Sequence, residues 1–61
     1  MTRRDYIFLA ETMRLALECD LLTADERRAV VRTAYIMADR LKANNPQFDV
    51  QMFLDNAGMR V

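Results

Sequence analysis

The chain has 61 residues, and 52% of them are hydrophobic, which is too large a share for a disordered segment. Its nine basic and nine acidic side chains cancel, so no overall field attracts the protein to nucleic acid or to an acidic membrane. One cysteine and no histidine exclude an internal disulfide and the usual transition-metal site. We expect a single domain over residues 1–61, with no metal and no cofactor.

A domain of this size is marginally stable on its own. It buries only about 60% of the surface that its unfolded chain exposes, and ordering each residue costs about 1.5 kcal/mol. Association with another chain is then the remaining way to bury more apolar surface. No apolar run approaches the roughly 18 residues of a membrane span, and the first residues lead into a charged amphipathic stretch rather than a secretion signal. We expect a cytoplasmic protein that does not enter a membrane.

The first predicted helix covers residues 3–19. Thr2 and Asp5 have the spacing in which the two residues cap a helix N-terminus reciprocally, and Asp5 also favours the positive end of the helix dipole. At 100° per residue, six apolar side chains fall on one face, which is the expected core side of the helix. These residues are Tyr6, Leu9, Ala10, Met13, Ala16 and Leu17.

Nearly opposite this face lies a second apolar row, made of Phe8, Leu15 and Cys19 and called the Phe8 row below. Three interpretations remain open: the third helix or the C-terminal tail covers the row, the row contacts another chain, or its residues are scattered apolar side chains exposed to solvent. A contiguous apolar row needs such an explanation, whereas isolated apolar side chains do not. Cys19 is expected to be a small buried side chain without redox chemistry, because the helix dipole and neighbouring acidic residues disfavour a thiolate.

The second predicted helix covers residues 24–44 and is the longest element. Thr23 and Glu26 form a capping box, about twenty residues follow without glycine or proline, and Asn45-Pro46 ends the helix. Its core face packs against the first helix to give an antiparallel hairpin. Tyr35 borders this face and Ile36 lies well away from it. The expected core residues are Val30, Val31, Ala34, Met37, Ala38 and Leu41.

The third predicted helix is short and covers residues 50–57. Asp49 is a favourable N-cap, and Phe48 and Phe53 occupy the two positions of a hydrophobic staple. Gly58 follows at the position where a positive φ commonly ends a helix. Met59 and Val61 are then expected to fold back towards the helix, because an apolar contact often accompanies this ending.

The C-terminal segment Asn45-Pro46-Gln47-Phe48-Asp49, followed by Met52-Phe53-Leu54 and Ala57-Gly58, resembles the ending of small uncharacterised helical proteins from phages and prophages. Such proteins also begin with a basic segment, Asp-Tyr and an apolar helix, as Thr2 to Ala10 do here. Where that family commonly has Cys-Gly near its end, this chain has Ala57-Gly58. The resemblance implies a phage or mobile-element origin and no established chemistry.

The residue types do not indicate an enzyme. No histidine, phosphate-binding glycine loop or nucleophile–base pair is present, so we expect no catalysis and no small-molecule substrate. The alternative function is a small DNA-binding regulator, because the long helix is basic. Against it, residues 18–26, which form the turn before that helix and its first residues, carry four acidic and no basic side chains. The residues of this alternative site are Arg27, Arg28, Arg32 and Lys42.

The sequence therefore predicts an all-α, three-helix domain that binds protein without catalysing a reaction. We expect it to form a homodimer, to dock on a host protein, or both; one example is an inhibitor of a bacterial defence system such as a CRISPR effector. The charged corners would fix the orientation of the partner. The predicted contact residues are Phe8, Leu15, Cys19, Tyr35 and Ile36.

Overall fold

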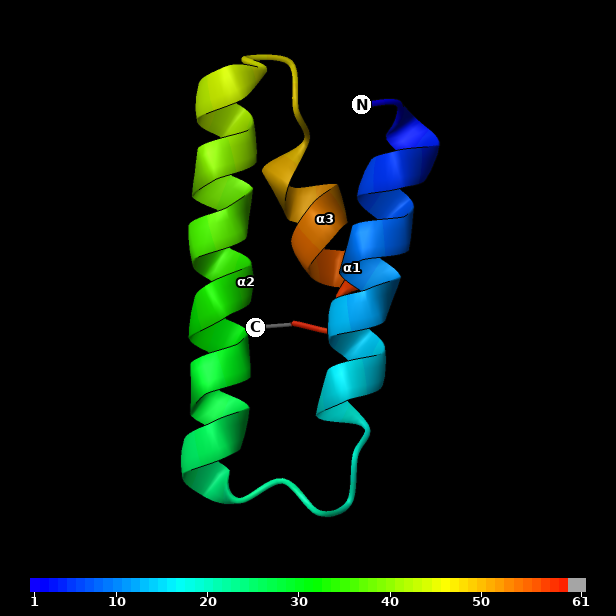
Figure 1. Ribbon diagram of the computed structural model, residues 1–61. Coiled ribbons are helices and arrows are strands. Elements are labelled where there is room, and N and C mark those ends of the chain that lie inside the picture. Colours follow the sequence, from blue (N-terminus) through cyan, green and yellow to red (C-terminus); the bar gives the residue numbers. More distant parts are fainter. Residues whose placement is uncertain (60–61) are drawn as a thin grey trace.

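The computed structural model describes residues 1–59, and this range contains three α-helices and no β-strand (Figure 1). Helix α1 spans Arg3–Leu17, α2 spans Ala24–Asn44 and α3 spans Val50–Asn56. The predicted all-α fold and the bounds of α2 are confirmed. Helix α1 ends two residues earlier than predicted, because Glu18 is its C-cap, and α3 ends one residue earlier, at the residue before its C-cap Ala57.

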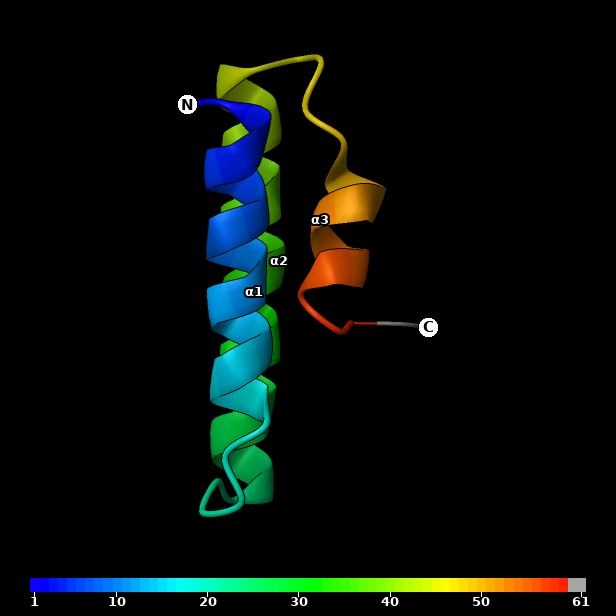
Figure 2. The same cartoon turned by 90° about the vertical axis from the view of Figure 1, so that its right-hand side faces the viewer.

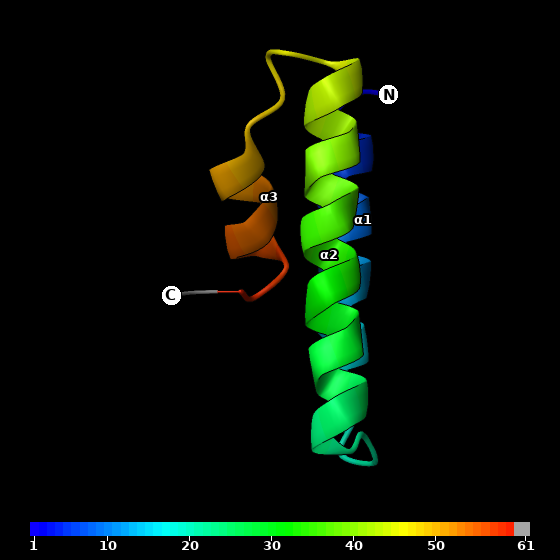
Figure 3. The ribbon, with the colours of Figure 1, turned by 90° about the vertical axis from the view of Figure 1, so that its left-hand side faces the viewer.

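Helices α1 and α2 run antiparallel and side by side, as the hairpin prediction required (Figure 1). Helix α3 does not lie in their plane. It packs on one face of the α1–α2 layer, as both side views show (Figures 2 and 3). The result is an elongated molecule of 35 × 19 × 18 Å, whose long axis follows α2.

Both predicted capping boxes are formed. At the start of α2, the Glu26 backbone N–H donates to the Thr23 hydroxyl at 3.1 Å, and the Thr23 N–H donates to the Glu26 carboxylate at 2.9 Å. At the start of α1, the Thr2 N–H donates to the Asp5 carboxylate at 2.9 Å. Each box satisfies N–H groups that have no partner inside the helix, so the two helix starts are fixed by residues adjacent in sequence.

We expect Thr23→Ala to lower the free energy of unfolding by about 1 kcal/mol, because the Glu26 N–H loses its acceptor. Thr33→Ala is the matched control. The Thr33 hydroxyl donates to the Ala29 carbonyl within α2 at 2.8 Å, and alanine is the better helix former there. Urea denaturation followed by circular dichroism measures both changes. Equal destabilisation by the two variants would contradict the role of the capping box.

The connection from α2 to α3 is held by local polar contacts. The Gln47 N–H donates to the Asn45 side-chain oxygen at 3.2 Å, which closes a turn around Pro46. The Lys42 ammonium donates to the Pro46 carbonyl at 2.6 Å and to the Phe48 carbonyl at 3.3 Å. These bonds satisfy carbonyl groups of the connection and direct Phe48 towards the core.

The aromatic staple of α3 is formed as predicted. The Phe48 ring lies 4.7 Å from the Tyr6 ring and 5.5 Å from the Phe53 ring, measured between centroids. Both phenylalanines are buried, with 4% and 2% of their surfaces exposed. These three rings therefore join the start of α1 to the start of α3.

Gly58 ends α3 with φ at +80°, the left-handed conformation predicted from its position. The Met59 N–H donates to the Leu54 carbonyl at 2.9 Å and the Gly58 N–H donates to the Asp55 carbonyl at 3.0 Å, which is the Schellman pattern. Met59 is buried, in agreement with the predicted return of the chain. The prediction for Val61 lies outside the described residues.

Alanines form the most deeply buried contacts. Ala10 of α1, Ala34 and Ala38 of α2 and Ala57 after α3 are each exposed by 1% or less. The larger side chains of the two predicted stripes lie around them and are only half buried, except that Val30, which was expected in the core, is half buried outside this cluster. Ala16 is a correction, because it was expected in the core and is exposed. Small side chains allow the three helices to approach closely, and the core remains thin.

Candidate interaction surface

The Phe8 row lies on the solvent side of α1. Phe8 is 69% exposed and Leu15 is 65% exposed, which are high values for large apolar side chains. Phe8 precedes buried Ala10 by two residues, so it points about 200° around the helix from a core position. Thr12 lies between Phe8 and Leu15 in the chain. Its hydroxyl donates to the Phe8 carbonyl at 2.8 Å, so this polar group already has a partner within the helix.

Helix α3 covers a different side of α1. The Arg3 guanidinium donates to the Met52 sulfur at 3.4 Å, and the side chain of Arg14 lies directly beside Gly58. Both arginines lie on the α3 side of α1, away from the Phe8 row. The interpretation in which the third helix covers the row is therefore wrong for the described residues.

Cys19 requires a second correction. It was expected to be buried, but it follows the C-cap of α1 and its side chain is exposed. Cys19 is a free thiol, and because it lies beyond the end of α1, helical periodicity no longer places it in line with Phe8 and Leu15.

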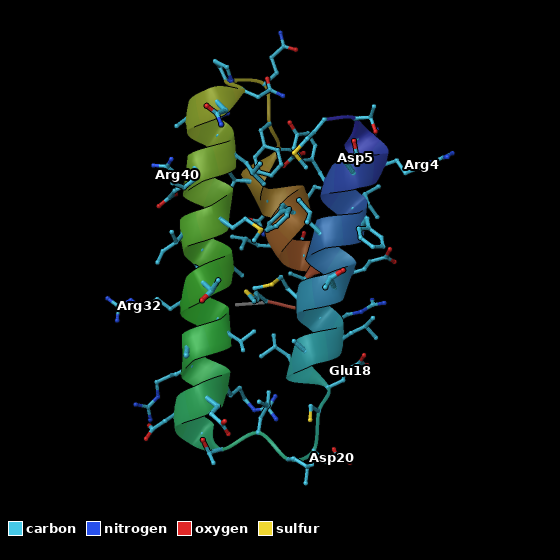
Figure 4. All side chains as sticks on the ribbon, viewed as in Figure 1. Arg4, Asp5, Glu18, Asp20, Arg32 and Arg40 are labelled. Atoms are coloured by element: carbon cyan, nitrogen blue, oxygen red, sulfur yellow. The ribbon has the colours of Figure 1, made fainter. Side chains whose placement is uncertain are left out.

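Charged side chains flank the Phe8 row on one side. Arg4, Glu11 and Glu18 recur every seven residues beside it, and all three are exposed. Arg4 projects near the start of α1, whereas Glu18 lies near its end (Figure 4). Within residues 1–59 the one ion pair joins Arg28 to Asp25 at 3.7 Å, so Arg4 and Glu18 form none with that part of their own chain.

Tyr35 and Ile36 do not join this surface. Ile36 is 55% exposed and follows buried Ala34 by two residues, so it lies on the outer edge of α2, away from α1. Tyr35 is 41% exposed and borders a shallow hollow with Leu17, Val31 and Met59. The predicted set of contact residues thus divides into the Phe8 row and two separate positions on α2.

The basic residues of the DNA-binding alternative do not form one free surface. The Arg27 guanidinium donates to the Leu17 carbonyl at 2.6 Å, and Lys42 donates to the α2–α3 connection. Arg28 lies beside Asp25, and Arg32 projects into solvent with Arg40 (Figure 4). Two of the four side chains therefore stabilise the fold of their own chain, which leaves fewer cations for phosphate contacts.

A groove of about 360 Å³ lies between the start of α1, the α2–α3 connection and α3, and sequence reasoning missed it. Its apolar walls include Tyr6, Ile7 and Phe53, and the Asn45 side-chain amide donates to the Tyr6 hydroxyl at 3.5 Å. The sequence signal for this groove was Ile7, an apolar residue that lies off the predicted core stripe of the first helix. In the structure Ile7 is half buried. No nucleophile–base pair lines the groove among the described residues.

No group of three or more histidine, cysteine, aspartate or glutamate side chains is placed to hold a metal ion within residues 1–59. None of the helices in the described part combines the length and apolar character that crossing a membrane requires. Comparisons with protein-family models, curated proteins and solved structures found no match of any kind.

Proposed function

We propose that this chain is a non-enzymatic protein-binding module and that the Phe8 row on α1 is its contact surface. The observation that carries the proposal is the exposure of Phe8 and Leu15 in one row, at 69% and 65%. Large apolar side chains exposed together commonly mark a protein interface. Aromatic side chains are also enriched at such interfaces.

The total surface of the chain supports the proposal. It exposes 4821 Å², compared with about 4100 Å² expected for a compact monomer of 7.1 kDa. Its radius of gyration is 11.5 Å, compared with about 10.5 Å for a typical domain of this length. The thin alanine core explains both values, because three short helices leave their outer faces in water.

The proposed setting is the cytoplasm of a bacterial host. The resemblance of both chain ends to small phage and prophage proteins supports a phage or mobile-element origin. A protein partner from the host, such as the effector of a defence system, and a second copy of this chain both fit the proposed module. The basic residues on α2 give less support to DNA binding, since Arg27 and Lys42 are engaged within the chain.

Site-specific photocrosslinking tests the proposal. A photoreactive benzoylphenylalanine replaces Glu11, which is exposed and flanks the Phe8 row, or Arg40, an exposed control position on α2. After irradiation of bacterial cells that express the chain, we expect a protein adduct from position 11 and none from position 40. Adding Phe8→Asp is expected to remove the adduct.

Either a self-adduct or an adduct with another protein that depends on Phe8 supports the module. Equal adducts from positions 11 and 40, or an adduct that persists with Phe8→Asp, would overturn the assignment of the contact surface. The absence of any adduct from position 11 would do the same.

A further inference from the structure

We propose that the partner of the Phe8 row is a second copy of this chain, whose α1 packs antiparallel against α1. This inference rests on the proposed function of the row. A two-fold axis passes near Glu11 and Thr12, midway between Phe8 and Leu15. Each row then contacts the same row of the second copy, as an isologous dimer requires.

The spacing of the row suits this arrangement. Phe8 and Leu15 are seven residues apart, which is about 10.5 Å along the helix axis, and they lie on the same face. With the axis midway between them, Phe8 packs on Leu15 of the second copy, and the same contact occurs twice. The small Thr12 lies near the axis and allows the two helices to approach.

The flanking charges select the antiparallel orientation. In the antiparallel pair, Arg4 lies beside Glu18 of the second copy, and this opposite-charge contact also occurs twice. In a parallel two-fold pair, the flanking residues of the two copies lie on opposite sides of the interface, so the contact between Arg4 and Glu18 is not made. Glu11 lies near Glu11 of the second copy, a repulsion at the solvent-exposed rim that a bound dimer tolerates.

The rest of the fold leaves this approach open. Helix α3 lies on one face of the α1–α2 layer, and α2 lies beside α1 (Figures 1 and 2). The high exposure of Phe8 and Leu15 means that neither helix covers the Phe8 row. Because α1 is only 15 residues long, we expect a dissociation constant on the order of micromolar.

Charge reversal tests the orientation of the dimer. In Arg4→Glu and in Glu18→Arg, each homodimer contains two repulsive contacts in place of two attractive ones. A mixture of the two variants restores both attractive contacts in the heterodimer. Sedimentation equilibrium measures the association of each variant alone and of the equimolar mixture. We expect each variant alone to dimerise about tenfold more weakly than the wild type, and the mixture to recover wild-type affinity.

Loss of folding does not confound this test. Glutamate in the first turn and arginine at the end of α1 both favour the helix dipole, so α1 is retained in each variant. Circular dichroism verifies this. Arg40→Glu, on the other helix, is the control and is expected to leave the dimer unchanged.

A dimer that Phe8→Asp disrupts but that both charge reversals leave unchanged would overturn the antiparallel pairing, while the row would remain an interface. A wild-type chain that stays monomeric at about one hundred times the expected dissociation constant would overturn the second copy as partner. The photocrosslinking at position 11 would still decide whether the row binds another protein, so the two proposals fail separately.

Discussion

Phe53→Ala is expected to unfold most of the protein at room temperature. Phe53 is 2% exposed and lies against Phe48, with 5.5 Å between the ring centroids. Removing a buried phenylalanine ring costs about 3–5 kcal/mol, and a single core in a chain this short supplies about 3–5 kcal/mol in total. The lost ring also removes one half of the staple that orients α3. The measurement is the helical circular dichroism signal as a function of temperature.

Phe8→Ala is the matched control, because it removes the same side chain from a position that is 69% exposed. In the monomer we expect a change in the free energy of unfolding of no more than about 0.5 kcal/mol. The measurement is made at low protein concentration, where association does not contribute to stability. If Phe8→Ala unfolded the chain as Phe53→Ala does, Phe8 would be a core residue and the Phe8 row would not be an interaction surface.

Ala34→Leu is expected to lower the free energy of unfolding by about 1–3 kcal/mol, or to separate the helices. Ala34 is 0% exposed and is part of the close contact among the three helices. Three additional carbon atoms have no space there, so either a side chain leaves its preferred rotamer or a helix moves. Urea denaturation followed by circular dichroism measures the change in stability.

The control for this prediction is Ala29→Leu, on the exposed side of the same helix. Leucine has nearly the helix propensity of alanine, so the expected change is within about 0.5 kcal/mol. Similar stabilities for the two leucine variants would contradict the close packing of α2 at Ala34. A more stable Ala34→Leu variant would indicate space between the helices that the structure does not have.

The amino-acid sequence by itself determined where the three helices begin and where α2 ends, and it identified the glycine that follows α3. Thr2, Thr23 and Asp49 accept hydrogen bonds from residues three positions later, and Gly58 adopts the positive φ that ends α3. These signals are readable because each contact joins residues that are neighbours in the chain. The antiparallel hairpin and the staple of Phe48 and Phe53 follow from the same local pattern and short connections.

Only the tertiary structure decided which faces are covered. Helical periodicity gives the angle of a side chain around its own axis, but it does not give the side on which a neighbouring helix packs. Helix α3 could cover the Phe8 row or the opposite side of α1, and Arg3 and Arg14 show that it takes the latter. The exposure of Cys19 depends on α1 ending at Leu17, and the separation of Ile36 from Phe8 depends on the order of the helices in space. Contacts between residues far apart in sequence fix these features, because they require the whole chain to be packed at once.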